Sequence, residues 1–268
     1  MNITRRMFLQ RLGAGAAGLG LASTLSGCRT LGLGLRGNVL PRSTPEAEGI
    51  SSASVTAFLA AAARNKYELH SLMILRHGRV VAEGWWTPYG PEFVHTLYSL
   101  SKSFTSTAVG LAVAEGRLTV DDRVVKFFPE DDLPASVSEN LAALRVKDLL
   151  SMAAGDEKEP TRDMVNHENW VRHFLAAPIT HAPGSVFMYN SAATYMCSAI
   201  VQQLTGQKLI DYLRPRLFQP LGIKGATWET CPRGINTGGW GLSVRTEDLA
   251  RFGQLYLQKG MWRDQRIL

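Results

Sequence analysis

The chain has 268 residues, of which 45% are hydrophobic and 19% are charged, and its formal net charge is +6. This length allows one large domain or two small ones with a buried core, and the composition is that of a globular protein. Part of the positive charge lies near the N-terminus, and no run rich in Lys and Arg follows it. We therefore expect no nucleic-acid binding.

The first 27 residues have the pattern of a signal peptide. Arg5 and Arg6 match a twin-arginine (Tat) signal, although they also suit the basic region of an ordinary signal. The Gly/Ala-rich stretch from Leu12 to about Leu25 is too short and its side chains are too small for a comfortable membrane span. We expect export of the protein, with residues 1–27 removed.

Cys28 ends the tetrapeptide Leu25-Ser26-Gly27-Cys28, which resembles a bacterial lipobox. In lipoproteins with this motif the chain is cut before the cysteine, and the cysteine sulfur receives a lipid. The alternative is an incidental cysteine at the end of a signal peptide. We expect a lipid anchor on Cys28, a linker over residues 28–45 that is rich in Gly and Pro, and a location in the bacterial cell envelope, facing the periplasm.

Residues 46–268 have the pattern of one domain. Apolar runs at strand spacing, Leu72–Leu75 and Val80–Ala82, flank a turn at Gly78 and predict a hairpin. Apolar residues at helical spacing predict helices over Ser51–Lys66, Ser99 to about Glu115, Val146–Met152, Trp170–Ala176, Ala193–Leu204, Leu209–Phe218 (bent or split by Pro215) and Thr246 to Gly260, with Thr246 as the cap. Early strands followed by many helices favour an α/β (α+β) fold.

The tetrad Ser99-Leu100-Ser101-Lys102 is a candidate nucleophile site. A serine hydroxyl is a weak nucleophile until a base takes its proton, and residues three apart on a helix share one face. Such a tetrad arises by chance about once in a chain of this length. Alone it fits equally well a helix cap at Ser99 and a solvated Lys102.

Two longer segments strengthen the case. The tetrad continues into an apolar helix, and Pro183-Gly184-Ser185-Val186-Phe187-Met188-Tyr189-Asn190-Ser191 precedes a second one. With these segments in this order, residues 46–268 resemble the serine beta-lactamase and penicillin-binding-protein superfamily, near the class C beta-lactamases, DD-peptidases and related esterases. The resemblance implies an antiparallel sheet flanked by helices, with a helical region.

The resemblance also implies catalytic roles. Ser99 matches the acylated serine, Lys102 the lysine beside it, and Tyr189 the tyrosine of the Y-x-N motif, which shuttles a proton. Ser191 stands where the family has Asn, so we expect it to support substrate or neighbouring groups by hydrogen bonding. The Y-x-S form is closer to the esterase and amide-hydrolase branches than to the true beta-lactamases.

The family's third motif, K-T-G or H-x-G, does not occur in this chain. That motif lies on a strand whose backbone N–H completes the oxyanion hole. Asn236-Thr237-Gly238 is the nearest string, but it lies in a glycine-rich loop, and we do not assign it this role. We therefore expect the chain to be C-terminally incomplete, with the final strands of the sheet missing.

We expect no metal site and no cofactor. His167-Glu168 lacks the second histidine of H-E-x-x-H, and His173 and His181 do not restore the spacing, so both are expected at the surface or at caps. Cys197 lies in an apolar run and is expected to be a small buried residue; we predict no disulfide with Cys231.

Two functions remain open at this point. The first is a serine hydrolase that acts through an acyl-enzyme on an ester, an amide or a D-Ala-D-Ala-type carbonyl, so its partner is a small-molecule or peptidoglycan-like substrate. The second is a non-catalytic envelope lipoprotein of the same fold that binds peptidoglycan or a protein partner.

Overall fold

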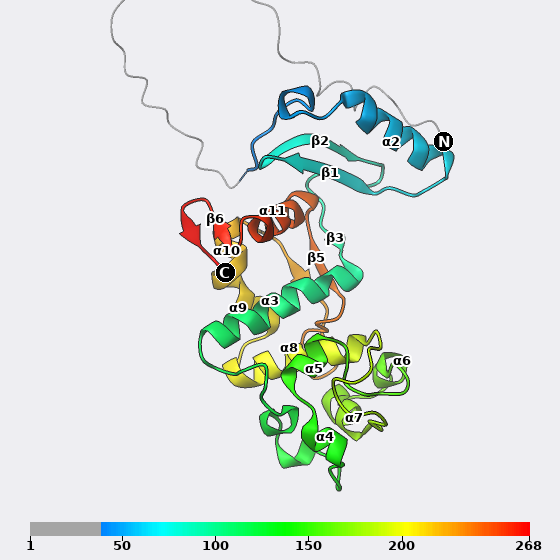
Figure 1. Cartoon of the computed structure of the whole chain (residues 1–268), viewed down its shortest axis with the longest axis vertical. Coiled ribbons are helices and arrows are strands. Elements are labelled where there is room, and N and C mark those ends of the chain that lie inside the picture. Colours follow the sequence, from blue (N-terminus) through cyan, green and yellow to red (C-terminus); the bar gives the residue numbers. More distant parts are fainter. Residues whose placement is uncertain (1–38) are drawn as a thin grey trace, which may run out of the picture. The chain divides into compact units, whose positions relative to one another are not determined.

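The computed structural model of the chain describes residues 39–268 (Figure 1). The expected signal peptide over residues 1–27 and the expected lipidation site at Cys28 lie outside the described residues. The described part divides into two compact units, one ending at Pro91 and one covering Glu92–Leu268. Each unit is described by itself. Among residues 39–268, no helix is both long enough and apolar enough to cross a membrane.

The first unit is built around the predicted hairpin. Strands β1 (Ser71–Arg76) and β2 (Arg79–Trp85) pair in antiparallel fashion, and the turn residues His77 and Gly78 have φ of 50° and 74°. Positive φ at both turn positions matches the right-handed twist of a two-residue hairpin, which confirms the predicted turn. Helix α2 (Ser52–Arg64), in the predicted place, lies beside the hairpin (Figure 1), after the short helix η1 (Glu46–Glu48).

Part of the segment expected as linker already belongs to this unit. The Val80 backbone N–H donates to the Pro41 carbonyl at 2.8 Å, and the Ser43 N–H donates to the Val80 carbonyl at 3.0 Å. Residues 41–43 therefore lie along the edge of β2.

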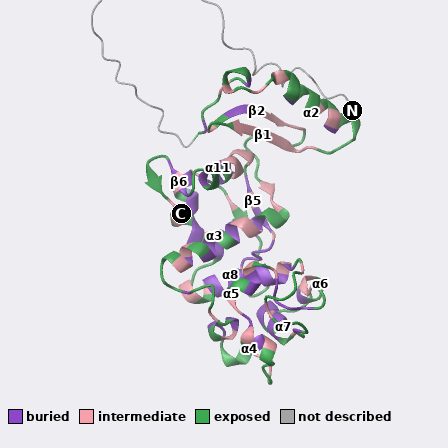
Figure 2. Cartoon of the chain, in the orientation of Figure 1, coloured by how far each residue is buried: buried purple, intermediate pink, exposed green. Residues whose placement is uncertain are grey.

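Helix α3 (Ser101–Ala114) lies at the centre of the second unit, and Figure 2 shows its buried positions. It packs against α8 (Ser191–Thr205), which is buried along most of its length. Phe104 is fully buried and stacks on Phe252 of α11 (Thr246–Leu257) with ring centroids 3.8 Å apart. Small side chains such as Ala108 let the helices approach closely at native packing density.

A small antiparallel sheet borders the start of α3. Its order is β3–β5–β4, with β3 at His95–Thr96, β5 at Leu242–Val244 and β4 at Thr227–Trp228. The sheet joins a segment just before α3 to one far along the chain. A third, two-stranded sheet pairs β6 (Met261–Trp262) with β7 (Gln265–Arg266).

Pro215 splits the predicted helix over Leu209–Phe218. The α-helical part, α9 (Leu209–Leu213), passes into a π-helical turn, η5 (Arg214–Phe218), and then into α10 (Gln219–Leu221). A proline cannot donate to the helical ladder and its ring crowds the preceding turn, so the wider turn accommodates it.

The remaining helices of the second unit are short. They are η2 (Tyr98–Leu100), η3 (Val124–Phe127), η4 (Glu130–Asp132), α4 (Glu139–Ala143), α5 (Val146–Leu150), α6 (Thr161–Met164) and α7 (Trp170–Ala176). The predicted cap of the last helix is wrong by one residue: the N-cap of α11 is Arg245, and its backbone N–H donates to the Asp248 carboxylate at 3.3 Å. Cys197 is buried, as predicted; Cys231 is buried as well, and both are free cysteines.

Candidate active site

Ser99 lies in a tightly constrained turn where η2 leads into α3. Leu97 donates its N–H to the Leu242 carbonyl at 2.8 Å, and Leu242 in turn donates its N–H to the buried Ser101 hydroxyl at 3.2 Å. Between these anchors, Tyr98 has a φ of 46°, a conformation that costs a non-glycine residue about 1–3 kcal/mol. Strand β5 thus fixes the backbone on both sides of Ser99, whose side chain is exposed.

Lys102 joins three parts of the chain through its ammonium group. Its Nζ donates to the Ser99 Oγ at 3.2 Å, to the Ser191 Oγ at 3.0 Å and to the Gly239 carbonyl at 2.7 Å. An ammonium group has three N–H donors, so all of them are used. The lysine is therefore held in place beside the Ser99 hydroxyl.

Tyr189 and Ser191 reach the same place from the start of α8. The Asn190 side chain between them caps α8, because its Oδ1 accepts the Ala193 backbone N–H at 2.8 Å. The Lys102 Nζ lies 4.9 Å from the centre of the Tyr189 ring. Asn190 is almost fully buried, whereas the Tyr189 side chain is about half exposed, at 49%.

Asn190 is anchored by a second buried polar group. Its Nδ2 donates to the Asp156 Oδ2 at 2.8 Å. Burial raises the pKa of the Asp156 carboxyl, and the hydrogen bond from Asn190 opposes that change. The turn that carries Tyr189 is thus tied to the loop before α6.

The surroundings of Tyr189 lower the pKa of its phenol group. Partial burial raises the pKa of Tyr189, but the neighbouring Ser99 hydroxyl and the positive charge of Lys102 outweigh this, so the pKa lies below the ordinary value of 10.0. The negative charge of Glu159 acts in the opposite direction. A tyrosine with a lowered pKa can accept a proton from a neighbouring hydroxyl more readily.

Glu159 holds the backbone of the Ser191 position. Its Oε1 accepts the Ser191 N–H at 3.0 Å and also accepts the Thr161 hydroxyl, while its Oε2 accepts the Thr161 N–H at 3.2 Å. Glu159 is not among the residues expected at the site from the sequence. A carboxylate in a polar loop carries no local signal that it lies near residue 191.

The glycine-rich loop completes the site. A Cβ at Gly238, where φ is +63°, would lie 2.8 Å from the Thr194 carbonyl, and a Cβ at Gly239 would lie 2.8 Å from the Ser191 carbonyl. Thr105 of α3 donates its hydroxyl to the Gly238 carbonyl at 2.8 Å. Only glycine fits where the loop meets α8, and this close approach brings the Gly239 carbonyl to Lys102.

The structure thus brings together all four residues singled out from the sequence: Ser99, Lys102, Tyr189 and Ser191. Their roles remain predictions. Among the described residues, one group of side chains could hold a metal ion, and it consists of Asp163, His167 and His173 rather than these four.

Comparison with known proteins identifies the family. The sequence profile described as Beta-lactamase matches residues 58–267. The chain belongs to the Beta-lactamase family. The resemblance to serine beta-lactamases and penicillin-binding proteins inferred from the sequence is thus confirmed.

Two proteins of known name are similar to the chain in sequence. The chain is 27% identical over 214 residues to the 6-aminohexanoate-dimer hydrolase of Paenarthrobacter ureafaciens, covering 74% of this chain and 54% of that protein. It is 26% identical over 154 residues to an Escherichia coli (strain K12) protein named "Putative D-alanyl-D-alanine carboxypeptidase", and the match covers 52% of this chain and 36% of that protein. The chain therefore spans about half the length of the first relative, and about a third of the second.

A solved structure shares the fold. The "Putative 6-aminohexanoate-dimer hydrolase from Bacillus anthracis" superposes with a TM-score of 0.68 at 21% identity, covering 78% of this chain and 59% of that one. The mixed fold of helices and antiparallel strands predicted from the sequence is thus confirmed.

Proposed function

We propose that this chain is a serine hydrolase that forms an acyl-enzyme on Ser99 and acts on an ester or a small linear amide. The observation that carries the proposal is the geometry of Lys102, which donates to Ser99, Ser191 and Gly239 at 2.7–3.2 Å. Three segments far apart in the sequence thus meet at the ammonium group that contacts the hydroxyl of one exposed serine. A mere helix cap would not need this convergence.

Tyr189 is the better candidate for the general base. All three donors of Lys102 are occupied, so Lys102 serves to hold Ser99 and to stabilise negative charge nearby. The neighbouring Ser99 hydroxyl and Lys102 ammonium group lower the pKa of Tyr189. When the pKa of a tyrosine base is closer to neutrality, a larger fraction of the molecules carries it in the deprotonated, active form.

The proposed reaction has two stages. The Ser99 Oγ attacks the carbonyl carbon of the substrate, and its proton passes to the Tyr189 phenolate. The bond from the carbonyl carbon to the leaving nitrogen or oxygen breaks, and Tyr189 returns the proton to that atom. Water then attacks the acyl-enzyme, with Tyr189 again as base, releasing the acid and restoring the Ser99 hydroxyl.

Two lines support an ester or amide over a beta-lactam. Ser191 stands in place of the family's Asn, as in the esterase and amide-hydrolase branches that the sequence resembles. A relative that matches 74% of this chain is named as a hydrolase of the 6-aminohexanoate dimer, by its name a hydrolase of a dimer of a small amino acid. A D-Ala-D-Ala peptide is the next substrate class to test, given the second relative's name.

Active-site labelling tests the proposal. A fluorophosphonate probe should modify Ser99 of the chain, as located by peptide mass spectrometry, and Ser99→Ala should abolish labelling. Ser103→Ala, one helical turn further along α3, is the matched control and should label like wild type. Tyr189→Phe should slow labelling and ester hydrolysis by about 10²–10⁴-fold, the range for loss of a general base. Labelling of Ser99→Ala at the wild-type rate would refute the proposal.

The same experiment addresses the non-catalytic alternative. If the wild-type chain reacts with neither the probe nor a panel of p-nitrophenyl esters, linear amides, D-Ala-D-Ala peptides and penicillins, a binding role for the fold is favoured. Peptidoglycan pull-down with wild type and Ser99→Ala would then measure that role directly.

We further propose a lipid anchor in the cell envelope, based on Arg5, Arg6 and the lipobox ending at Cys28. Expression in a bacterium with a radiolabelled fatty acid should label the wild-type chain and not Cys28→Ala. Replacement of both arginines by lysine should block export if the twin-arginine route is used, and a retained export would favour an ordinary signal.

A further inference from the structure

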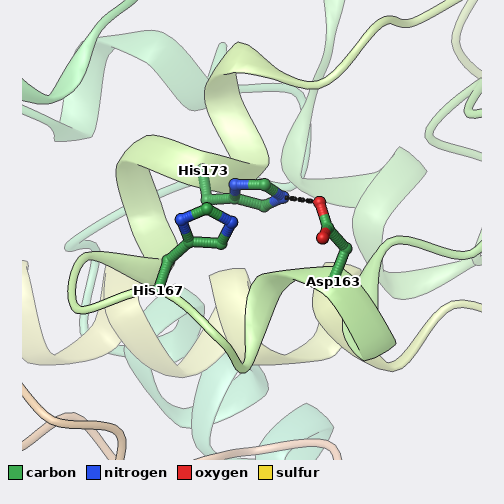
Figure 3. Close-up of side chains that lie close together, drawn as sticks. All are labelled: Asp163, His167 and His173. Atoms are coloured by element: carbon green, nitrogen blue, oxygen red, sulfur yellow. Dashed lines mark ion pairs between the residues drawn. The ribbon is translucent and has the colours of Figure 1, made fainter.

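Asp163, His167 and His173 form a cluster of metal-ligating side chains that includes none of the four candidate catalytic residues (Figure 3). The His173 Nε2 lies 2.9 Å from the Asp163 Oδ2. The rings of His167 and His173 stack with centroids 4.0 Å apart. One ligand atom from each residue lies within 4.8 Å of the others.

The backbone that presents these side chains is well anchored. The Asp163 backbone carbonyl accepts the Asn166 N–H at 3.0 Å, and the His167 N–H donates to the Met164 carbonyl at 3.1 Å, so the chain after α6 folds into a closed turn. Met164 is fully buried and fixes the inner side of this turn.

Helix α7 supplies the third side chain from an equally firm base. The Asn169 side chain caps it by accepting the Arg172 N–H at 3.0 Å and donates to the Asp132 carboxylate at 2.6 Å. Trp170 and Phe174 are buried on the inner face of the helix. His173 is thereby held toward the turn that carries Asp163 and His167.

We propose that Asp163, His167 and His173 bind one Zn²⁺ ion. Two imidazoles and one carboxylate are a donor set that suits this ion, and three protein ligands leave a fourth position for water. The His173–Asp163 contact supplies two of the ligands in near-coordinating positions. The ion would take the place of the proton between these two side chains.

Only one side chain has to move. Stacked rings aim their nitrogens along parallel planes, so His167 must rotate about its side-chain torsions to direct a nitrogen at the ion. His167 is exposed and lies in a turn, so its ring is free to turn without disturbing the core. The Asp163 side chain is 74% exposed and that of His173 is 22% exposed, which leaves the site open to an ion from solvent.

A bound ion would clip the four-residue helix α6 to the seven-residue helix α7. A helix of four residues has little stability of its own and depends on tertiary contacts. The clip should therefore slow the opening of the segment between Thr161 and His173.

Calorimetric titration of the full chain, purified without a histidine tag, tests the site. We expect one equivalent of Zn²⁺ to bind and Mg²⁺ not to bind, because Mg²⁺ requires oxygen ligands. Each of His167→Gln, His173→Gln and Asp163→Asn should weaken Zn²⁺ binding by about 10-fold or more, the scale seen when groups that support a metal are lost. His181→Gln, an exposed histidine outside the cluster, is the matched control and should bind like wild type.

Two further measurements guard against nonspecific binding or misfolding. Circular dichroism melts should show that the variants fold without metal, since none of the three side chains is in the core. Hydrogen exchange of residues 161–173 should slow on Zn²⁺ addition in wild type but not in His167→Gln. The proposal is overturned if wild type binds no Zn²⁺, if the cluster variants bind as tightly as wild type, or if His181→Gln loses as much affinity as they do.

Discussion

The Asn190 side chain makes two buried hydrogen bonds, and two different substitutions at this position can measure the energy of each. Its Oδ1 caps α8 through the Ala193 N–H, and its Nδ2 bonds to the Asp156 carboxylate, both at 2.8 Å. Loss of an N-cap costs about 0.5–2 kcal/mol, and a buried acceptor left without a partner costs about 1–3 kcal/mol. We expect Asn190→Ala to lower the free energy of unfolding by about 2–4 kcal/mol.

Asn190→Ser is the matched variant. A serine hydroxyl can still accept the Ala193 N–H and cap the helix, but it is too short to reach Asp156. Its cost should therefore be smaller than that of alanine, by roughly the 1 kcal/mol typical of a cap. Urea unfolding followed by tryptophan fluorescence measures all three proteins.

The pH dependence identifies the second contact. The hydrogen bond from Asn190 opposes the rise in the pKa of Asp156, so its loss in either variant should raise that pKa further. The folded state then binds a proton that the unfolded state has released, and stability falls as pH rises through the raised pKa. We expect both variants to lose more stability than wild type as the pH rises above the ordinary Asp pKa of 3.8. A loss under about 0.5 kcal/mol in Asn190→Ala, or equal losses in both variants, would refute this account.

Three further predictions follow from the core, the glycine loop and Asp156. Phe104→Ala should lower the free energy of unfolding by about 3–5 kcal/mol, because a fully buried ring stacked on Phe252 is lost; a loss below about 1 kcal/mol in urea unfolding would contradict this packing. Gly238→Ala should lower the melting temperature and slow probe labelling, because φ is +63° and the added methyl group has no room. Gly253→Ala, on the open face of α11, is the control and should stabilise the protein by about 0.5–1 kcal/mol. Equal effects of the two substitutions would be inconsistent with the close approach of the loop to α8. Asp156→Asn keeps a side-chain acceptor for Asn190 but cannot ionise. The free energy of unfolding of this variant relative to wild type should therefore increase as the pH rises from the ordinary Asp pKa of 3.8 through the raised pKa. A difference in urea unfolding that stays constant across this range would contradict a raised pKa of Asp156.

Local chemistry in the sequence determined much of the fold. The hairpin at His77-Gly78 follows from turn residues with positive φ between two apolar runs, and α7 forms over Trp170–Ala176 as the helical spacing of apolar residues predicts. The spacing of Ser99 and Lys102 brings the two side chains within hydrogen-bond reach where η2 leads into α3. These features depend on residues a few positions apart, which is the range over which a sequence pattern carries information.

Only the tertiary structure decided what surrounds Ser99 and which histidines meet. The Gly239 carbonyl accepts a hydrogen bond from Lys102, which lies 137 positions earlier in the sequence. The sequence of the glycine-rich loop does not indicate this partner. The sequence spacing of His167 and His173 fits no helical zinc motif, yet the fold after α6 stacks their rings. Contacts of this kind arise from the packing of separate elements around a common core, and no local periodicity encodes which elements will meet.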